Sequence, residues 1–119
     1  MNQTQDDADH LVVFLSGDLI FASRVKGAAE RAGLTFMLSG SLPTNEADRI
    51  RYVILDLSTR SSLTSELVQQ CGESCPQAKV VAYGPHVQAE RLKAAREAGI
   101  PSVLTRGQFD ATLATMFAQ

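Results

Sequence analysis

The run Tyr52-Val53-Ile54-Leu55, which ends at the carboxylate of Asp56, constrains the fold of this chain more than any other segment. Unbroken apolar runs with β-branched and aromatic residues are typical of strands buried on both faces, as in the centre of a parallel sheet. In open α/β sheets, ligands bind just beyond the carboxyl ends of the strands. The sequence therefore predicts that Asp56 lies where such a sheet would hold a ligand.

Four further apolar runs have the length of strands, and helical patterns separate the runs from one another. The other strands are predicted over 11–15, 35–38, 79–83 and 102–105. This alternation predicts a three-layer, flavodoxin-like α/β fold of five parallel strands, with the strand order 2-1-3-4-5. In that order the segment after the first strand lies beside Asp56.

The helical segments carry recognisable start and stop residues. Asp18 is a good N-cap for the first helix, and Gly33 is expected to end that helix. The third helix has Leu63, Leu67 and Cys71 on one face, the fourth lies between Pro85 and Gly99, and the fifth spans about 109–117 with Leu113 and Phe117 facing inward. Residues 46–49 favour a short helical turn, and residues 58–62 are predicted to form a polar loop.

The 119 residues suffice for one domain, which we place at 11–119 behind a flexible tail at 1–10. The 11 basic and 13 acidic residues give a net charge of −2, which does not indicate a nucleic-acid or membrane partner. No apolar run has the length of a membrane span, and the polar, acidic start is unlike a signal peptide. The expected location is therefore the cytoplasm.

Three short motifs stand at the ends of predicted strands and helices. Leu55-Asp56-Leu57 ends the third strand, Glu97-Ala98-Gly99 ends the fourth helix, and Val103–Arg106 ends the fifth strand. Over Leu11 to Phe117 this pattern resembles a response-regulator receiver domain. In that family the Asp at the end of the third strand accepts a phosphoryl group, so the resemblance makes Asp56 the candidate phosphoacceptor.

The other functional positions of the family carry different residues here. The acidic pair that holds Mg²⁺ in receivers corresponds to Ser16 and Gly17, with Asp18 one place later. Gly84 takes the place of a Thr or Ser, and Arg106 takes the place of a Lys. The degenerate pocket predicted from the resemblance thus comprises Ser16, Gly17, Asp18, Gly84 and Arg106.

A carboxylate accepts a phosphoryl group only where charge is neutralised, and Mg²⁺ does this when one or two well-placed carboxylates hold it. Ser16 and Gly17 supply none, so we expect no specific Mg²⁺ site, no metal ligands and no cofactor. Asp18 is expected to act as a helix cap. We predict instead a direct, partly exposed ion pair between Asp56 and Arg106, contributing about 1 kcal/mol or less.

Three other chemical interpretations are weaker. His86 follows the fourth strand, but no Ser, Cys or carboxylate is placed to complete a triad with it. Cys71 and Cys75 lack the spacing of a metal or redox pair and are expected to be free, structural thiols. A flavin site would need aromatic side chains, yet Tyr52 and Tyr83 are both predicted within strands.

The sequence favours a pseudo-receiver, a signalling domain that acts by protein–protein interaction and is not an enzyme. The first alternative is a phosphorylatable receiver of a two-component phosphorelay that uses Asp56, Asp18 and Arg106 with Mg²⁺. The second is a flavodoxin-like enzyme or nucleotide binder. The partners implied by the resemblance are a sensor kinase or an output protein.

The receiver resemblance also implies an interface. In the family, the fourth helix, fifth strand and fifth helix commonly mediate dimerisation and partner binding. In this chain the fourth helical segment offers a mixed surface of small and polar residues, namely Val87, Gln88, Arg91, Ala94 and Ala95. We therefore predict that any partner, or a second copy of the chain in a homodimer, binds at this face.

Overall fold

The sheet has five parallel strands in the order β2-β1-β3-β4-β5, as predicted. The computed structural model describes residues 10–117, so the predicted tail lies outside the described residues except for His10. The strands are β1 (Leu11–Leu15), β2 (Thr35–Ser39), β3 (Ile50–Asp56), β4 (Lys79–Gly84) and β5 (Ser102–Thr105).

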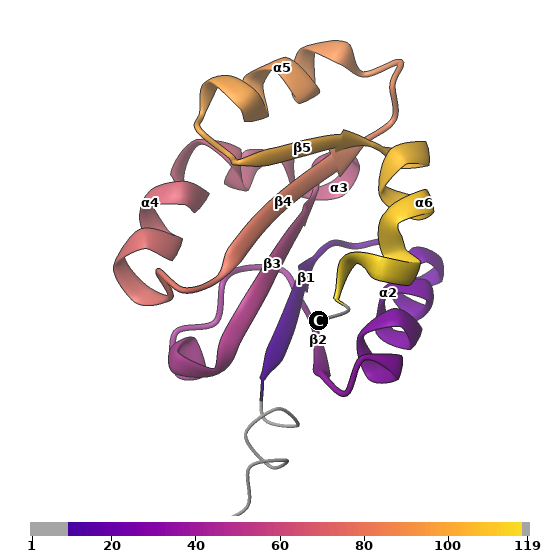
Figure 1. Cartoon of the computed structure of the whole chain (residues 1–119). Helices are drawn as coiled ribbons and strands as arrows, with labels where there is room; N and C mark the ends of the chain where they lie inside the picture. The colour runs from indigo at the N-terminus through magenta and orange to yellow at the C-terminus, as the bar shows by residue number, and fades with distance from the viewer. Residues whose placement is uncertain (1–9, 118–119) are drawn as a thin grey trace, which may run out of the picture.

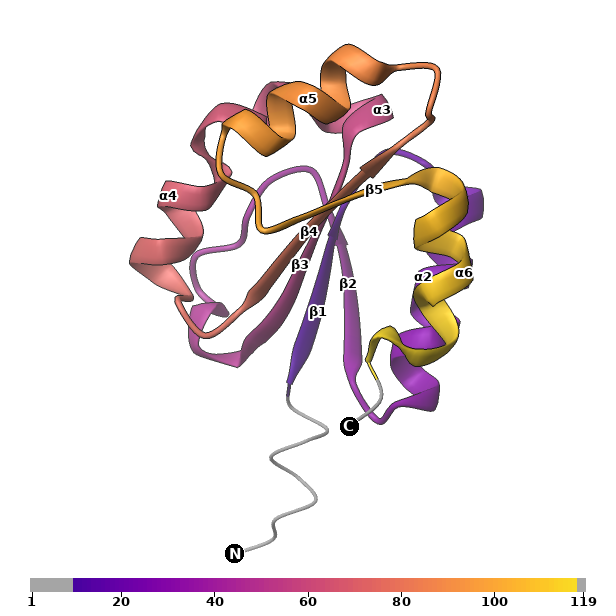
Figure 2. The same ribbon diagram turned by 45° about the horizontal axis from the view of Figure 1, so that its top comes forward.

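Helices cover both faces of the sheet, which gives the predicted three layers (Figures 1 and 2). Helices α2 (Leu19–Arg31) and α6 (Arg106–Met116) lie side by side on one face. The other face carries the short α3 (Leu57–Arg60), followed by α4 (Thr64–Ser74) and α5 (Ala89–Glu97). Two 3₁₀ turns, η1 (Ala47–Arg49) and η2 (Ser61–Leu63), complete the described elements.

Alternate residues of the central strands supply two separate cores. In β1, Val13 and Leu15 face the side of α4 and α5, whereas Val12 and Phe14 face the side of α2 and α6. All four side chains are fully buried. A strand buried on both faces must be apolar throughout, which explains why the central strands read as continuous apolar runs.

The core beneath α2 and α6 is largely aromatic. Tyr83 of β4 stacks on Phe109 of α6, with ring centroids 4.3 Å apart and planes inclined by 6°. Phe21 of α2 is tilted against both rings, at 5.5 Å from Tyr83 and 5.7 Å from Phe109. Arg24 donates hydrogen bonds to Asp110 across the outer surface of the two helices. This cluster therefore fixes the start of α6 against the start of α2.

The helix signals were placed correctly at three positions. Asp18 is the N-cap of α2 and accepts a hydrogen bond from the backbone N–H of Phe21 at 3.0 Å. Gly33 and Gly99, which follow α2 and α5, have φ angles of 81° and 89°. This left-handed region favours glycine because a Cβ atom would be strained there.

Two local predictions were wrong. Residues 58–62 form α3 and the start of η2 instead of a loop, because the Asp56 carboxylate caps the turn through the N–H of Ser58. Helix α5 does lie between Pro85 and Gly99, and it begins at Ala89 after a turn in which the carbonyl of Pro85 accepts from the N–H of Gln88 at 2.9 Å. Helix α6 begins at Arg106, three residues earlier than predicted, because Thr105 and Gln108 form a capping box.

Candidate functional site

The carboxylate of Asp56 is buried at the carboxyl end of β3, with the residue only 2% exposed. Its Oδ2 atom accepts hydrogen bonds from the hydroxyls of Ser16 at 2.7 Å and Thr59 at 2.8 Å. Its Oδ1 atom accepts from the backbone N–H of Ser58 at 2.9 Å. Three neutral donors therefore satisfy this anion from within the fold.

Both hydroxyls also bind the loop between β1 and α2. Ser16 Oγ accepts a hydrogen bond from the N–H of Asp18, and Thr59 Oγ1 accepts one from the N–H of Gly17, each at 2.9 Å. Each hydroxyl thus passes a hydrogen bond from a backbone N–H to Asp56 Oδ2. The network joins the loop after β1 to the turn after β3. Each of its two hydroxyls donates one hydrogen bond and accepts one.

The predicted ion pair between Asp56 and Arg106 is wrong. Arg106 Nη2 donates to Asp18 Oδ2 at 3.0 Å, and its guanidinium lies 5.1 Å from the ring centroid of Phe21. Because the capping box starts α6 at Arg106, the side chain leaves from a helix that packs against α2. Asp18 therefore has two structural tasks, capping α2 through Oδ1 and binding Arg106 through Oδ2.

Solved structures with a similar fold include response regulators. A response regulator from Thermotoga maritima has a TM-score of 0.62 at 17% identity, covering 89% of this chain and 98% of that one. A response regulator protein from Burkholderia pseudomallei with a phosphorylated aspartic acid, calcium ion and citrate also has a TM-score of 0.62 at 17% identity, covering 91% of this chain and 68% of that one. The chain has the fold of receiver domains.

The same fold occurs in a putative pilus assembly protein (cpaE) from Burkholderia thailandensis, with a TM-score of 0.59 and 13% identity. That comparison covers 88% of this chain and 92% of the other. No family model matches the sequence, and no curated protein is similar to it. At these low identities the comparisons show a shared fold. They do not show that the same residues form the site.

Arg60 is a site residue that sequence reasoning missed. It donates to its neighbour's carbonyl, Thr59 O, at 2.9 Å, and its guanidinium lies over the loop after β1. A Cβ atom on Gly17 would meet Arg60 Nη1 at 3.2 Å, and one on Gly40 would meet Arg60 Nε at 3.8 Å. Only the contact at Gly17 is tight, so glycine at this one position helps Arg60 to lie across the mouth of the receiver cleft, a role that the expected loop at 58–62 concealed.

Gly84 ends β4 in contact with the turn that Asp56 caps. A Cβ atom there would lie 3.3 Å from Leu57 Cβ and 3.8 Å from Leu92 Cδ2. Leu57 itself is fully buried. A Thr or Ser side chain at this position would therefore be in close contact with Leu57.

Replacing Gly84 by Ala is expected to destabilise the protein by about 1–2 kcal/mol, because the backbone of α3 must move to relieve the contact with Leu57 Cβ. The matched control is Gly72→Ala in α4, where a Cβ atom would meet nothing within 4 Å. The control should stabilise by about 0.5–1 kcal/mol through helix propensity. Urea unfolding measures both, and a stabilised Gly84→Ala variant would contradict the close packing.

Tyr83 carries a buried hydroxyl next to this network. Within residues 10–117 the hydroxyl has no hydrogen-bond partner, and the residue is 2% exposed. Burial raises the pKa of Tyr83 and the negative charges of Asp56 and Asp18 raise it further, while Arg106 and the nearby Ser16 hydroxyl oppose them. The phenol is therefore held neutral and contributes no charge to the cleft.

Within residues 10–117 the remaining predicted groups make no hydrogen bond to Asp56. His86 is exposed in the turn before α5, and Tyr52 and Tyr83 are strand residues, as predicted. Cys71 and Cys75 are buried free thiols on the α4 side. Burial, with a contribution from Cys75, raises the pKa of Cys71 to about 12, so this thiol stays protonated.

The donor set offers little to a metal ion. Among residues 10–117, no three side chains of the His, Cys, Asp and Glu types gather closely enough to bind one. Asp18 and Asp56 are the acidic groups of the cleft, and both are engaged in hydrogen bonds. In the same part of the chain, every helix is too short or too polar to cross a membrane.

Proposed function

We propose that this chain is a pseudo-receiver, a receiver-fold signalling domain that acts by protein–protein interaction without Mg²⁺-dependent phosphorylation and without enzymatic activity. One observation carries the proposal: the Ser16 and Thr59 hydroxyls satisfy Asp56 Oδ2, while Asp56 itself is 2% exposed. The two hydroxyls occupy the carboxylate oxygen that a metal ion would otherwise bind, but they supply no positive charge.

The chemistry of phosphoryl transfer supports the proposal. The attacking carboxylate oxygen needs an accessible lone pair, and the charge gathering on the transferred group needs a cation. At Asp56 an incoming phosphoryl group would have to displace Ser16 and Thr59, which would also release the N–H groups of Asp18 and Gly17. Asp18 could join a metal site only by giving up Arg106.

The alternative function is phosphorylation of Asp56 with Mg²⁺. It is favoured by the fold neighbour from Burkholderia pseudomallei, whose structure has a phosphorylated aspartic acid. Two cations, Arg60 and Arg106, also lie at the cleft mouth and could receive a phosphoryl group if their present contacts opened. Phosphorylation of Asp56 would require the loop after β1 and the turn after β3 to change conformation together.

The test exposes the protein to acetyl phosphate with millimolar Mg²⁺ and measures intact mass. We expect no gain of a phosphoryl group, whereas a receiver with an intact acidic pair should be modified in the same reaction. A parallel titration with beryllofluoride and Mg²⁺ should leave the amide signals of Asp56 and Thr59 unchanged. Mass gain by the wild type that Asp56→Asn abolishes would overturn the pseudo-receiver proposal.

We place the interaction surface on α5, β5 and α6. Strand β5 is an edge strand, with an unpaired side that can accept another chain. A mainly apolar groove of about 570 Å³ lies beside it, lined in part by Val81, Pro101, Leu104 and Met116. Val87, in the turn before α5, is a separate apolar side chain that is 78% exposed. A second copy of the chain is the partner that we propose for this face.

Val87→Glu is expected to weaken self-association at least about fivefold, because a charge would enter the interface. The fold should be unaffected, since the side chain is exposed. Ile20→Glu is the matched control: Ile20 is 84% exposed at the start of α2, away from α5 and β5. Sedimentation equilibrium measures the association, and equal effects of the two variants would remove this face from the proposal.

A further inference from the structure

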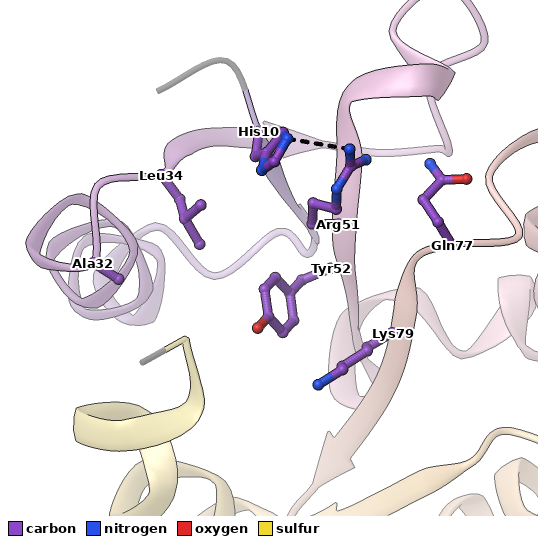
Figure 3. A pocket seen from close by; sticks show the side chains of 7 residues that line it. All are labelled: His10, Ala32, Leu34, Arg51, Tyr52, Gln77 and Lys79. Carbon is purple, nitrogen blue, oxygen red and sulfur yellow. Dashed lines mark hydrogen bonds between the residues drawn. The ribbon is translucent and has the colours of Figure 1, made fainter. Parts of the chain in front are cut away.

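A second hollow lies at the opposite end of the sheet from Asp56. It has a volume of about 330 Å³ and opens at the amino ends of β3 and β4, beside the start of β1 (Figure 3). Arg51 and Tyr52 enter it from β3, Lys79 from β4, and His10 from the residue before β1. The parallel order of the strands brings these distant residues together.

The two strong cations of the hollow lack acidic partners. Arg51 Nη1 donates to the carbonyls of Asp48 at 3.1 Å and Ile50 at 3.3 Å, and Nη2 lies 3.1 Å from His10 Nε2. These contacts hold the guanidinium in place without neutralising its charge. The exposed ammonium of Lys79 lies 6.0 Å from the ring centroid of Tyr52. Within residues 10–117 neither cation forms an ion pair.

Charge at this hollow is opposite in sign to that of the whole chain. The net charge of the chain is −2, yet among the described residues 10–117 no Asp or Glu lines the hollow. Unpaired cations gathered in a concave site raise the local potential and attract anions more strongly than the same charges on a convex surface. The lining therefore selects for negative charge.

The walls of the hollow are mixed, with Tyr52 and Leu34 in their apolar part and Gln77 in their polar part. Tyr52 is 7% exposed and Leu34 is 8% exposed, and the Tyr52 ring stands between the Arg51 and Lys79 side chains in Figure 3. A volume of about 330 Å³ is at the small end of ligand sites. An aromatic wall flanked by two cations suits a flat apolar body that carries a negative group.

We infer that this hollow binds a small organic anion, a carboxylate or phosphate ester on a flat apolar body. Arg51 and Lys79 contact the anionic group, and Tyr52 and Leu34 contact the body. The site uses no residue of the Asp56 cleft, so it goes beyond the proposed pseudo-receiver function, although Tyr52 and Lys79 also line the apolar groove beside β5.

The test is an NMR titration of the full chain with defined probes. Benzoate and phenyl phosphate should shift the amide signals of Tyr52 and Lys79 saturably in the millimolar range, and they distinguish a carboxylate from a phosphate ester. Benzamide, which has the same body without charge, and inorganic phosphate, which lacks the body, should each bind at least about fivefold more weakly. Equal binding of either control, or no saturable shift with either anion, overturns the inference.

Variants locate the binding. Lys79→Gln and Arg51→Gln should each weaken benzoate binding about fivefold, whereas Lys26→Gln on the exposed face of α2 should leave it unchanged. Lys79 is exposed, so Lys79→Gln should leave the fold unchanged. It therefore tests the site even if Arg51→Gln loosens η1 by removing the contact with Asp48. Unchanged affinity in Lys79→Gln, or equal weakening in Lys26→Gln, contradicts the site.

A competing occupant lies in the chain itself, because Asp6, Asp7 and Asp9 precede His10 in the sequence. The titration is therefore repeated on a variant with all three changed to Asn. Benzoate affinity within about twofold of the wild type supports the inference. Binding that appears only in the Asn variant assigns the hollow to the amino-terminal residues of the chain and overturns it.

Discussion

Replacing Asp56 by Asn is expected to destabilise the protein by about 2–4 kcal/mol, although the two side chains have nearly the same shape. With its amide oxygen toward the N–H of Ser58, the new side chain points its NH₂ group at Ser16 and Thr59. Both hydroxyl protons then lose their acceptor inside the protein. The reverse orientation points the NH₂ group at the N–H of Ser58, so that two donors face each other and neither has an acceptor.

The loss extends beyond the carboxylate because both hydroxyls are already committed. Ser16 accepts from the N–H of Asp18, and Thr59 accepts from the N–H of Gly17. A hydroxyl that rotates to find a new acceptor must do so without breaking these bonds. The cost is therefore larger than the value of about 1 kcal/mol that an exposed ion pair with Arg106 would predict.

Asp18→Asn is the matched control, since it removes the same charge from the same cleft. Asn caps helices about as well as Asp, so the bond from the Phe21 N–H can persist. The bond from half-exposed Arg106 weakens, and we expect a loss of about 1 kcal/mol or less. Urea unfolding with unchanged m-values measures both variants. Equal losses would show that charge, and not the hydroxyl network, governs the stability of the cleft.

The strand pattern of the sheet could be predicted because burial on both faces leaves a strong signal. The runs at 11–15 and 102–105 match β1 and β5, and the run that ends at Asp56 matches the end of β3. The position of Asp56 and the capping role of Asp18 followed from local rules that tertiary structure did not override. These parts of the site depend on single segments of the chain.

The partners of Asp56 could not be predicted in the same way. Thr59 reaches the carboxylate only because residues after β3 turn into α3, and a Ser- and Thr-rich stretch reads equally well as a loop. The error at Arg106 was avoidable, since Thr105 followed three residues later by Gln108 is a capping-box signature. The hollow that holds Arg51 and Lys79 needs the strand order and register as well as the sequence.

Replacing Phe109 by Ala is expected to destabilise the protein by about 3–5 kcal/mol. Phe109 is fully buried, and it is the residue through which α6 contacts both Tyr83 and Phe21. Removing the ring leaves a cavity between α6 and the sheet, next to a Tyr83 hydroxyl that already lacks a partner. Thermal and urea unfolding measure the loss. Phe36→Ala, at a half-buried ring on edge strand β2, is the control and should cost about 1–2 kcal/mol.

The same variant tests whether the aromatic cluster positions Arg106. Arg106 lies one helical turn before Phe109, and its guanidinium packs over Phe21 while it binds Asp18. If Phe109 fixes the start of α6, its loss should broaden or shift the Arg106 side-chain signals, whereas Phe36→Ala should leave them unchanged. A Phe109→Ala protein that loses stability but keeps the Arg106 signals would show that the capping box at Thr105 alone sets this end of the helix. Arg106 would then be held at the receiver cleft by local sequence, independently of the core.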